Sequence, residues 1–181
     1  ITDADGNGFI STDGGAELVE AVIGDDNDGE IVIPGTIDDD GTTLTVKSIR
    51  EDCFDGIEDK SQVSVIDLSE TSITNVNVDR SAGIFAGFPD DTMIYLPDGN
   101  TASEGEKNVV IGGVCKEFML SESKSFKNRH EFEAEHVAFD REFLQGLAAT
   151  LYLPFSIPAG EAADLGTFHT FKEIDSEGNA I

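Results

Sequence analysis

Apolar residues occur along this chain in short extended runs, separated by turns rich in Asp, Asn and Gly. Several runs contain β-branched residues or alternate with polar ones, which is typical of strands. The turns at 25–29 and 38–41 hold residue types that accept tight backbone conformations. The pattern predicts a mainly β protein, with strands expected at 18–23, 31–33, 42–46, 63–68, 93–96, 109–111 and 118–120.

One short phrase occurs twice, as Phe54-Asp55-Gly56-Ile57 and as Phe85-Ala86-Gly87-Phe88, thirty-one residues apart. An internal period of this size is typical of a solenoid, in which each coil buries its apolar side against the next. We therefore expect Phe54 and Phe85 to be buried as successive rungs of one core. The Gly of each copy is expected to allow the tight bend behind it.

Three phrases carry a resemblance to a known family: Ile31-Val32-Ile33-Pro34, Val46-Lys47-Ser48-Ile49 and Cys53-Phe54-Asp55-Gly56. They resemble the BspA-like leucine-rich repeats of Bacteroidales surface proteins. Cys53 stands where that family usually has Ala, and Ser69 stands where Pro is expected. The resemblance implies a short leucine-rich-repeat solenoid and an adhesion-type role at the cell surface. It names no ligand.

A second resemblance begins near Phe126. The segment is similar to the start of a β-sandwich-like module that follows such repeats in Bacteroidales secreted proteins. The phrases that carry it are Phe132-Glu133-Ala134, Phe139-Asp140-Arg141-Glu142-Phe143 and Thr150-Leu151-Tyr152-Leu153-Pro154-Phe155. We therefore expect a repeat domain over 1–125, with its core at 29–120, and a partial second module over 126–181.

Charge restricts the partners. The chain has 11 Lys and Arg against 37 Asp and Glu, a formal net charge of -26. Nucleic acid and anionic membranes would be repelled, whereas divalent cations and basic partners are not excluded. A solvated acidic surface that gives solubility in a salty medium is the simplest explanation. No stretch is long enough for a membrane span, and the start at Ile1 suggests a processed form whose signal peptide or lipid anchor would lie upstream.

The N-terminal stretch contains a calcium candidate. Asp3, Asp5 and Asn7 alternate as in an EF-hand loop, with Gly at the turn position that follows. The twelfth position, where a bidentate Glu belongs, is Gly14, and no helix signal precedes the loop. The alternative is an Asp/Gly hairpin that leads into an extended segment.

Other metal and thiol candidates are weak. A strand over 130–136 would place His130 and His136 about 20 Å apart, and a helix would also separate them, so neither geometry makes a metal site. Two cysteines, Cys53 and Cys115, are too few for a disulfide framework, and both lie among apolar residues. We expect two buried thiols.

No catalytic constellation stands out in the sequence, and no cofactor motif is present. The expected function is that of a non-enzymatic cell-surface or secreted protein, which presents a repeat face to an extracellular protein or glycan. Two alternatives stay open: a calcium-stabilised structural module, and an accessory domain of a larger glycan-degrading enzyme.

Overall fold

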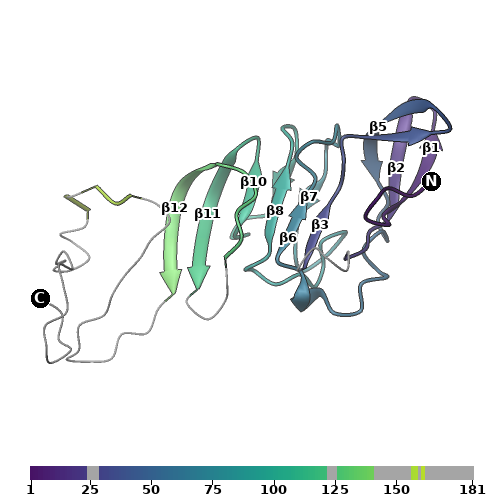
Figure 1. Ribbon diagram of the computed structural model, residues 1–181. Coiled ribbons are helices and arrows are strands. Elements are labelled where there is room, and N and C mark those ends of the chain that lie inside the picture. The colour runs from purple at the N-terminus through teal and green to yellow at the C-terminus, as the bar shows by residue number, and fades with distance from the viewer. Residues whose placement is uncertain (24–28, 122–125, 141–155, 159, 162–181) are drawn as a thin grey trace, which may run out of the picture. The chain divides into compact units, whose positions relative to one another are not determined.

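A computed structural model describes residues 1–23, 29–121, 126–140, 156–158 and 160–161 (Figure 1). Its contacts divide the chain into two units, Ile1–Arg141 and Glu142–Ile181. Residues 126–140, expected to open the second module, belong to the first unit. Nearly all of the second unit, including the phrase at 150–155, lies outside the described residues, so the β-sandwich-like module stays a prediction.

The N-terminal part of the first unit forms a four-stranded sheet. Its strand order is β1 (Gly8–Thr12), β2 (Gly15–Glu20), β5 (Thr42–Ile49) and β4 (Thr36–Asp39). The β1–β2 and β4–β5 pairs are antiparallel hairpins, and β2 runs parallel to β5. The β1–β2 turn uses Gly14 at a φ of 102°, a conformation that L side chains rarely adopt.

The rest of the unit is built around a six-stranded mixed sheet. In spatial order its strands are β12 (Glu133–Asp140), β11 (Val114–Ser121), β10 (Val109–Ile111), β8 (Met93–Leu96), β6 (Val65–Asp67) and β3 (Glu30–Val32). The four strands β3, β6, β8 and β10 are mutually parallel, β11 is antiparallel to β10, and β12 is parallel to β11. Smaller elements are the pair β7 (Asn77–Val78) and β9 (Thr101–Ala102) and the 3-10 helix η1 (Lys60–Gln62).

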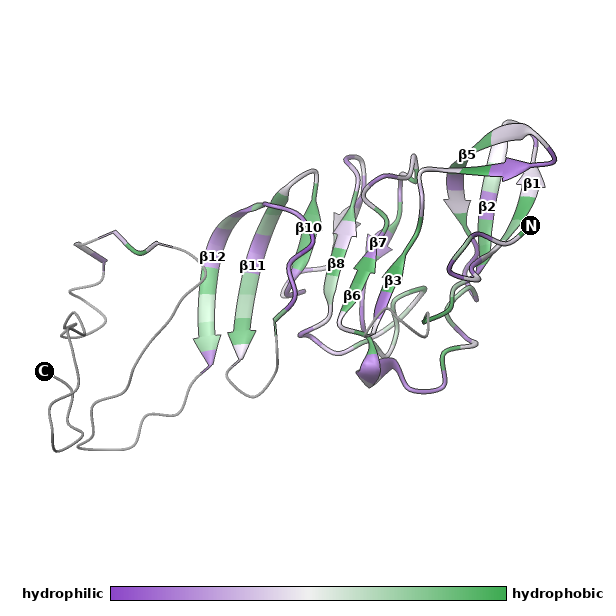
Figure 2. Cartoon of the chain, in the orientation of Figure 1, coloured by the Kyte–Doolittle hydropathy of each residue, from purple (hydrophilic) through white to green (hydrophobic). Residues whose placement is uncertain are grey.

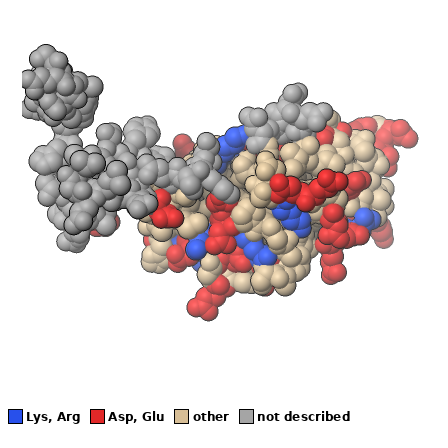
Figure 3. All heavy atoms as spheres, turned by 90° about the horizontal axis from the view of Figure 1, so that it is seen from below, with Lys and Arg blue, Asp and Glu red and all other residues tan. Residues whose placement is uncertain are grey.

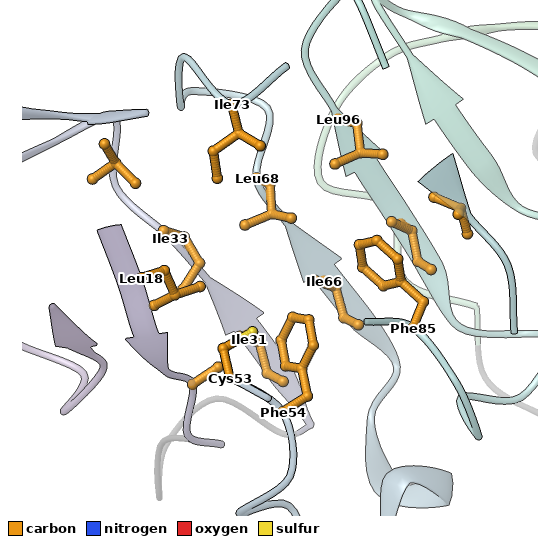
Figure 4. Packing of buried hydrophobic residues seen from close by; sticks show 14 of the residues in the cluster. Leu18, Ile31, Ile33, Cys53, Phe54, Ile66, Leu68, Ile73, Phe85 and Leu96 are labelled. Carbon is orange, nitrogen blue, oxygen red and sulfur yellow. The ribbon is translucent and has the colours of Figure 1, made fainter. Parts of the chain in front are cut away.

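The inner face of the parallel strands forms the main core. Register places Ile31, Ile66, Ile94 and Val109 opposite one another on successive strands, and all four belong to one buried cluster. Figure 4 shows Ile31 and Ile66 together with Phe54, which approaches them from a connecting segment. Apolar side chains in register on neighbouring strands bury area continuously, which is the main stabilising term of this sheet.

The opposite face of the same strands is also buried. Asp67 and Tyr95 are in register on β6 and β8, and both side chains point away from the main core because neighbouring residues alternate. Asp67 is 3% exposed and Tyr95 is 1% exposed. Parallel strands that are covered on both faces read as nearly continuous apolar runs, and Figure 2 shows β6 and β10 largely in the hydrophobic colour.

The expected leucine-rich-repeat solenoid is wrong, although the chain is mainly β as predicted. A solenoid of that kind adds one parallel strand per coil to a single sheet. Here the N-terminal strands form a separate sheet with antiparallel hairpins, and β11 reverses the direction of the six-stranded sheet. The apolar pattern predicted which residues are buried, but it did not predict which strands pair with one another.

The two Phe side chains of the repeated phrase are buried in the core, as predicted. Phe54 is 1% exposed and Phe85 is 0% exposed, and their ring centroids lie 5.8 Å apart. The two glycines differ: Gly87 has a left-handed φ of 86°, whereas Gly56 is not among the residues with positive φ. The expected bend therefore depends on glycine only in the second copy.

Both thiols are buried and unpaired with each other, as predicted. Burial raises the pKa of Cys53 to about 12 and that of Cys115 to about 11. Both groups are therefore neutral thiols at physiological pH, and neither is a reactive nucleophile.

Candidate functional site

A segment that we call the strap, residues 126–132, crosses the outer face of the six-stranded sheet. On β11, Phe118 makes edge-to-face ring contacts with Phe126 and Phe132, at centroid distances of 5.2 and 5.1 Å. On β8, the Tyr95 ring packs edge-on against His130 at 5.3 Å. The strap thus occupies the face that a repeat protein would have presented to a partner.

The strap is held at Asp67, a buried carboxylate on β6. Its Oδ1 accepts hydrogen bonds from the backbone N–H and the hydroxyl of Ser69, at 3.0 and 2.6 Å. Its Oδ2 accepts from Arg129 Nε at 3.1 Å, and His130 Nε2 lies 2.6 Å away. Burial disfavours the ionised form, but the hydrogen bonds from Ser69 and His130 outweigh it, and the pKa of Asp67 is lowered.

A second ion pair fixes the strap to the edge strand β3. Arg129 Nη1 lies 2.7 Å from Glu30 Oε2, and Lys127 Nζ lies 3.5 Å from the other oxygen. Arg129 thus bridges two carboxylates that come from neighbouring strands. The Tyr95 hydroxyl donates to Asn128 at 2.8 Å, so the polar groups along the middle of the strap have partners.

The trio of Ser69, His130 and Asp67 has the composition of a hydrolase triad but not its geometry. A triad histidine accepts the serine proton at one ring nitrogen and donates to the carboxylate from the other. Here Ser69 Oγ, at 3.3 Å, and Asp67 Oδ2 both approach the same nitrogen, Nε2 of His130. An ionised carboxylate only accepts, so Nε2 carries the hydrogen and cannot take the serine proton. The cluster joins the strap to the sheet.

Beside this junction lies a groove of about 520 Å³. It is bordered by the N-terminal loop 2–5, by residues 32–38 around the start of β4, by Asp67 and Glu70, and by Arg129 and His130 of the strap. Val32, Ile33, Pro34 and Ile37 contribute its apolar surface. The volume lies within the range of small-ligand and side-chain pockets.

Three exposed carboxylates stand around the groove: Asp5, Asp38 and Glu70. They come from the N-terminal loop, from β4 and from the segment after β6, so only the tertiary structure brings them together. None of the three takes part in the ion pairs found among the described residues. Arg129 and His130, at the strap side, are engaged by Asp67. The accessible charge of the groove is therefore negative.

The calcium candidate at Asp3, Asp5 and Asn7 forms a tight loop. Asp3 Oδ1 accepts from the backbone N–H groups of Asp5 and Asn7, at 3.0 and 2.9 Å. Asn7 is 0% exposed, and its amide bonds to Val22, Val32 and Asp3. The Asn7 oxygen is thus already engaged with a backbone N–H, and calcium binding at this loop stays a prediction. In the described part of the chain, no three His, Cys, Asp or Glu side chains are grouped as metal ligands.

The junction was missed in the sequence because its members are far apart. Arg129 and His130 are 62 and 63 residues from Asp67. The sequence pattern at 130–136 pairs His130 only with His136, which lies exposed on β12. One local signal existed: Asp67 interrupts the apolar run from Val65 to Leu68, and a charge inside a buried strand requires partners.

Comparison with known proteins finds no matching family model, no significantly similar curated protein and no significantly similar solved structure. The residues themselves therefore carry the functional argument. Among the described residues, no helix is long and apolar enough to cross a membrane.

Proposed function

We propose that this protein is a non-enzymatic binding protein, cell-surface or secreted, that holds an extracellular protein or glycan in the groove beside the strap. The observation that carries the proposal is the groove itself, in which apolar surface meets three carboxylates that form no ion pair among the described residues. A preformed site of this kind binds without the cost of ordering a loop.

The chemistry around the groove supports binding over turnover. Asp67 has all four acceptor positions occupied and Ser69 donates its proton to it, so neither group is available as a base or a nucleophile. The proposed cell-surface or secreted location comes only from the sequence phrases at 31–34, 46–49 and 53–56, whose implied solenoid the structure does not show. The net charge of -26 disfavours nucleic acid as the partner.

A blocking variant tests the proposal. Thr36 is exposed on β4 and borders the groove, so Thr36→Trp should fill part of it. Ser11 is exposed on β1 and lies outside the groove, so Ser11→Trp is the control. The wild-type protein is screened against extracellular-matrix proteins and a glycan array. We expect a partner whose binding is lost in Thr36→Trp and kept in Ser11→Trp. A screen without any partner would refute the proposal, and turnover in a broad hydrolase panel would indicate an enzyme instead.

A further inference from the structure

The groove combines an apolar floor with an unbalanced charge at its border. Ile33 and Ile37 are nearly fully buried at its base, while the half-buried Val32 and Pro34 leave part of their surface accessible. Acidic side chains on a flat surface would only be solvated. Here they surround a concavity into which an alkyl chain can be buried.

Charge complementarity selects the occupant. Asp5, Asp38 and Glu70 approach from three elements, and the cations at the strap side are engaged by Asp67 and Glu30. Figure 3 shows several groups of acidic side chains on the described surface that it presents, with Lys and Arg in smaller groups between them. A cation entering the groove would meet three carboxylates that no ion pair of the described residues neutralises, whereas an anion would be repelled.

Lysine and arginine match both parts of the groove. Their alkyl stems cover apolar surface while the charged end stays near water and carboxylates. At about 520 Å³ the groove has the volume of a pocket for a drug-sized ligand, so it has room for more than one such side chain.

Resting on the proposed function, we infer that the groove binds an extended segment of a partner protein that carries closely spaced lysine or arginine side chains. The apolar floor holds the stems, and the three carboxylates pair with the charged ends. A neutral glycan would gain nothing from the three carboxylates as charges, so it is the less favoured partner.

The test measures binding of a fluorescent peptide with lysine at every third position, and of its counterpart with glutamate in place of lysine. The groove variant combines Asp5→Asn, Asp38→Asn and Glu70→Gln. Loss of three partly exposed ion pairs should weaken binding of the lysine peptide by about tenfold. The glutamate peptide should not bind to either protein.

A second triple variant controls for net charge. Asp13, Glu51 and Asp55 are exposed and lie outside the groove, so converting them to their amides removes the same charge. We expect this control to weaken binding of the lysine peptide by less than about twofold, because salt screens charges that lie far from the groove. Equal weakening in both triple variants would show non-specific attraction and overturn the inference.

Two further outcomes separate this inference from the proposed function. If a neutral glycan binds and is lost in Thr36→Trp, while the lysine peptide does not bind, the inference fails and the proposed function stands. If calorimetry shows calcium alone binding to the wild type and not to the groove variant, and the peptide is inactive, the carboxylates form a cation site and the inference fails. If neither the peptide nor any member of the partner screen binds, both fail.

Discussion

Replacing Asp67 with asparagine should loosen the strap without changing the size of the side chain. Asparagine keeps one oxygen, which can still accept from the N–H and hydroxyl of Ser69. Its amide nitrogen would then face Arg129 Nε and His130 Nε2, which both donate to the carboxylate in the wild-type protein. The change therefore removes the negative charge. It also places the N–H groups of the new amide opposite the N–H groups of Arg129 and His130, so these hydrogen bonds cannot form.

The expected loss in the free energy of unfolding depends on how deeply Asp67 is buried and on which partners Arg129 and His130 keep. The Asp67 side chain is 4% exposed, while those of Arg129 and His130 are 36% and 40% exposed. Loss of a hydrogen bond to a charged group costs about 1.5–3 kcal/mol, and breaking a fully buried ion pair costs more. Water can reach Arg129, which also keeps Glu30 as a partner. We expect Asp67→Asn to lower the free energy of unfolding by about 2–3 kcal/mol.

Urea unfolding at neutral pH measures this loss directly. Trypsin cleavage after Lys127 and Arg129, both within the strap, should also become faster because the strap leaves the sheet more often. Glu70→Gln is the control, since Glu70 is exposed and takes no part in the ion pairs that hold the strap among the described residues; it should change stability by less than about 0.5 kcal/mol. Unchanged stability and unchanged cleavage in Asp67→Asn would refute the role of Asp67 in holding the strap.

The pH dependence gives an independent check. The folded-state pKa of Asp67 lies below its ordinary value of 3.8, whereas the unfolded chain retains the ordinary value. The carboxylate therefore contributes its full stabilisation well above pH 3.8 and loses it as the pH falls through the folded-state pKa. The stability difference between wild type and Asp67→Asn should be constant above about pH 5 and should shrink in stronger acid. A difference that grows on acidification would contradict the assignment.

Three other predictions concern the repeated phrase and the two thiols. Phe54→Ala should lower the free energy of unfolding in urea by about 3–5 kcal/mol because it leaves a cavity, and Phe54→Leu should cost clearly less; equal effects would argue against tight packing there. Gly87→Ala should cost about 1 kcal/mol through its positive φ, whereas Gly56→Ala should be neutral or stabilising, because its added Cβ meets only Glu20 at 3.9 Å. Cys53 and Cys115 should resist iodoacetamide at neutral pH until urea unfolds the protein, as followed by mass spectrometry; labelling of the native protein would contradict their burial.

The sequence by itself determined the class of structure and much of the core. Short β-branched runs between Asp/Gly turns predicted a mainly β chain, because strand and turn preferences act over a few residues. The same holds for Phe54 and Phe85, whose burial follows from large apolar groups inside a repeated local pattern. Burial of Cys53 and Cys115 followed from their apolar neighbours.

Only the tertiary structure decided how the strands pair and where the groove lies. The parallel stack from β3 to β10 suggested a repeat, but the reversal at β11 and the separate N-terminal sheet depend on contacts between distant segments. Asp67 meets Arg129 across 62 residues, and Asp5, Asp38 and Glu70 converge from three elements. Local conformational preferences carry no information on these tertiary contacts. Contacts between residues far apart in sequence depend on how entire sheet faces pack against one another.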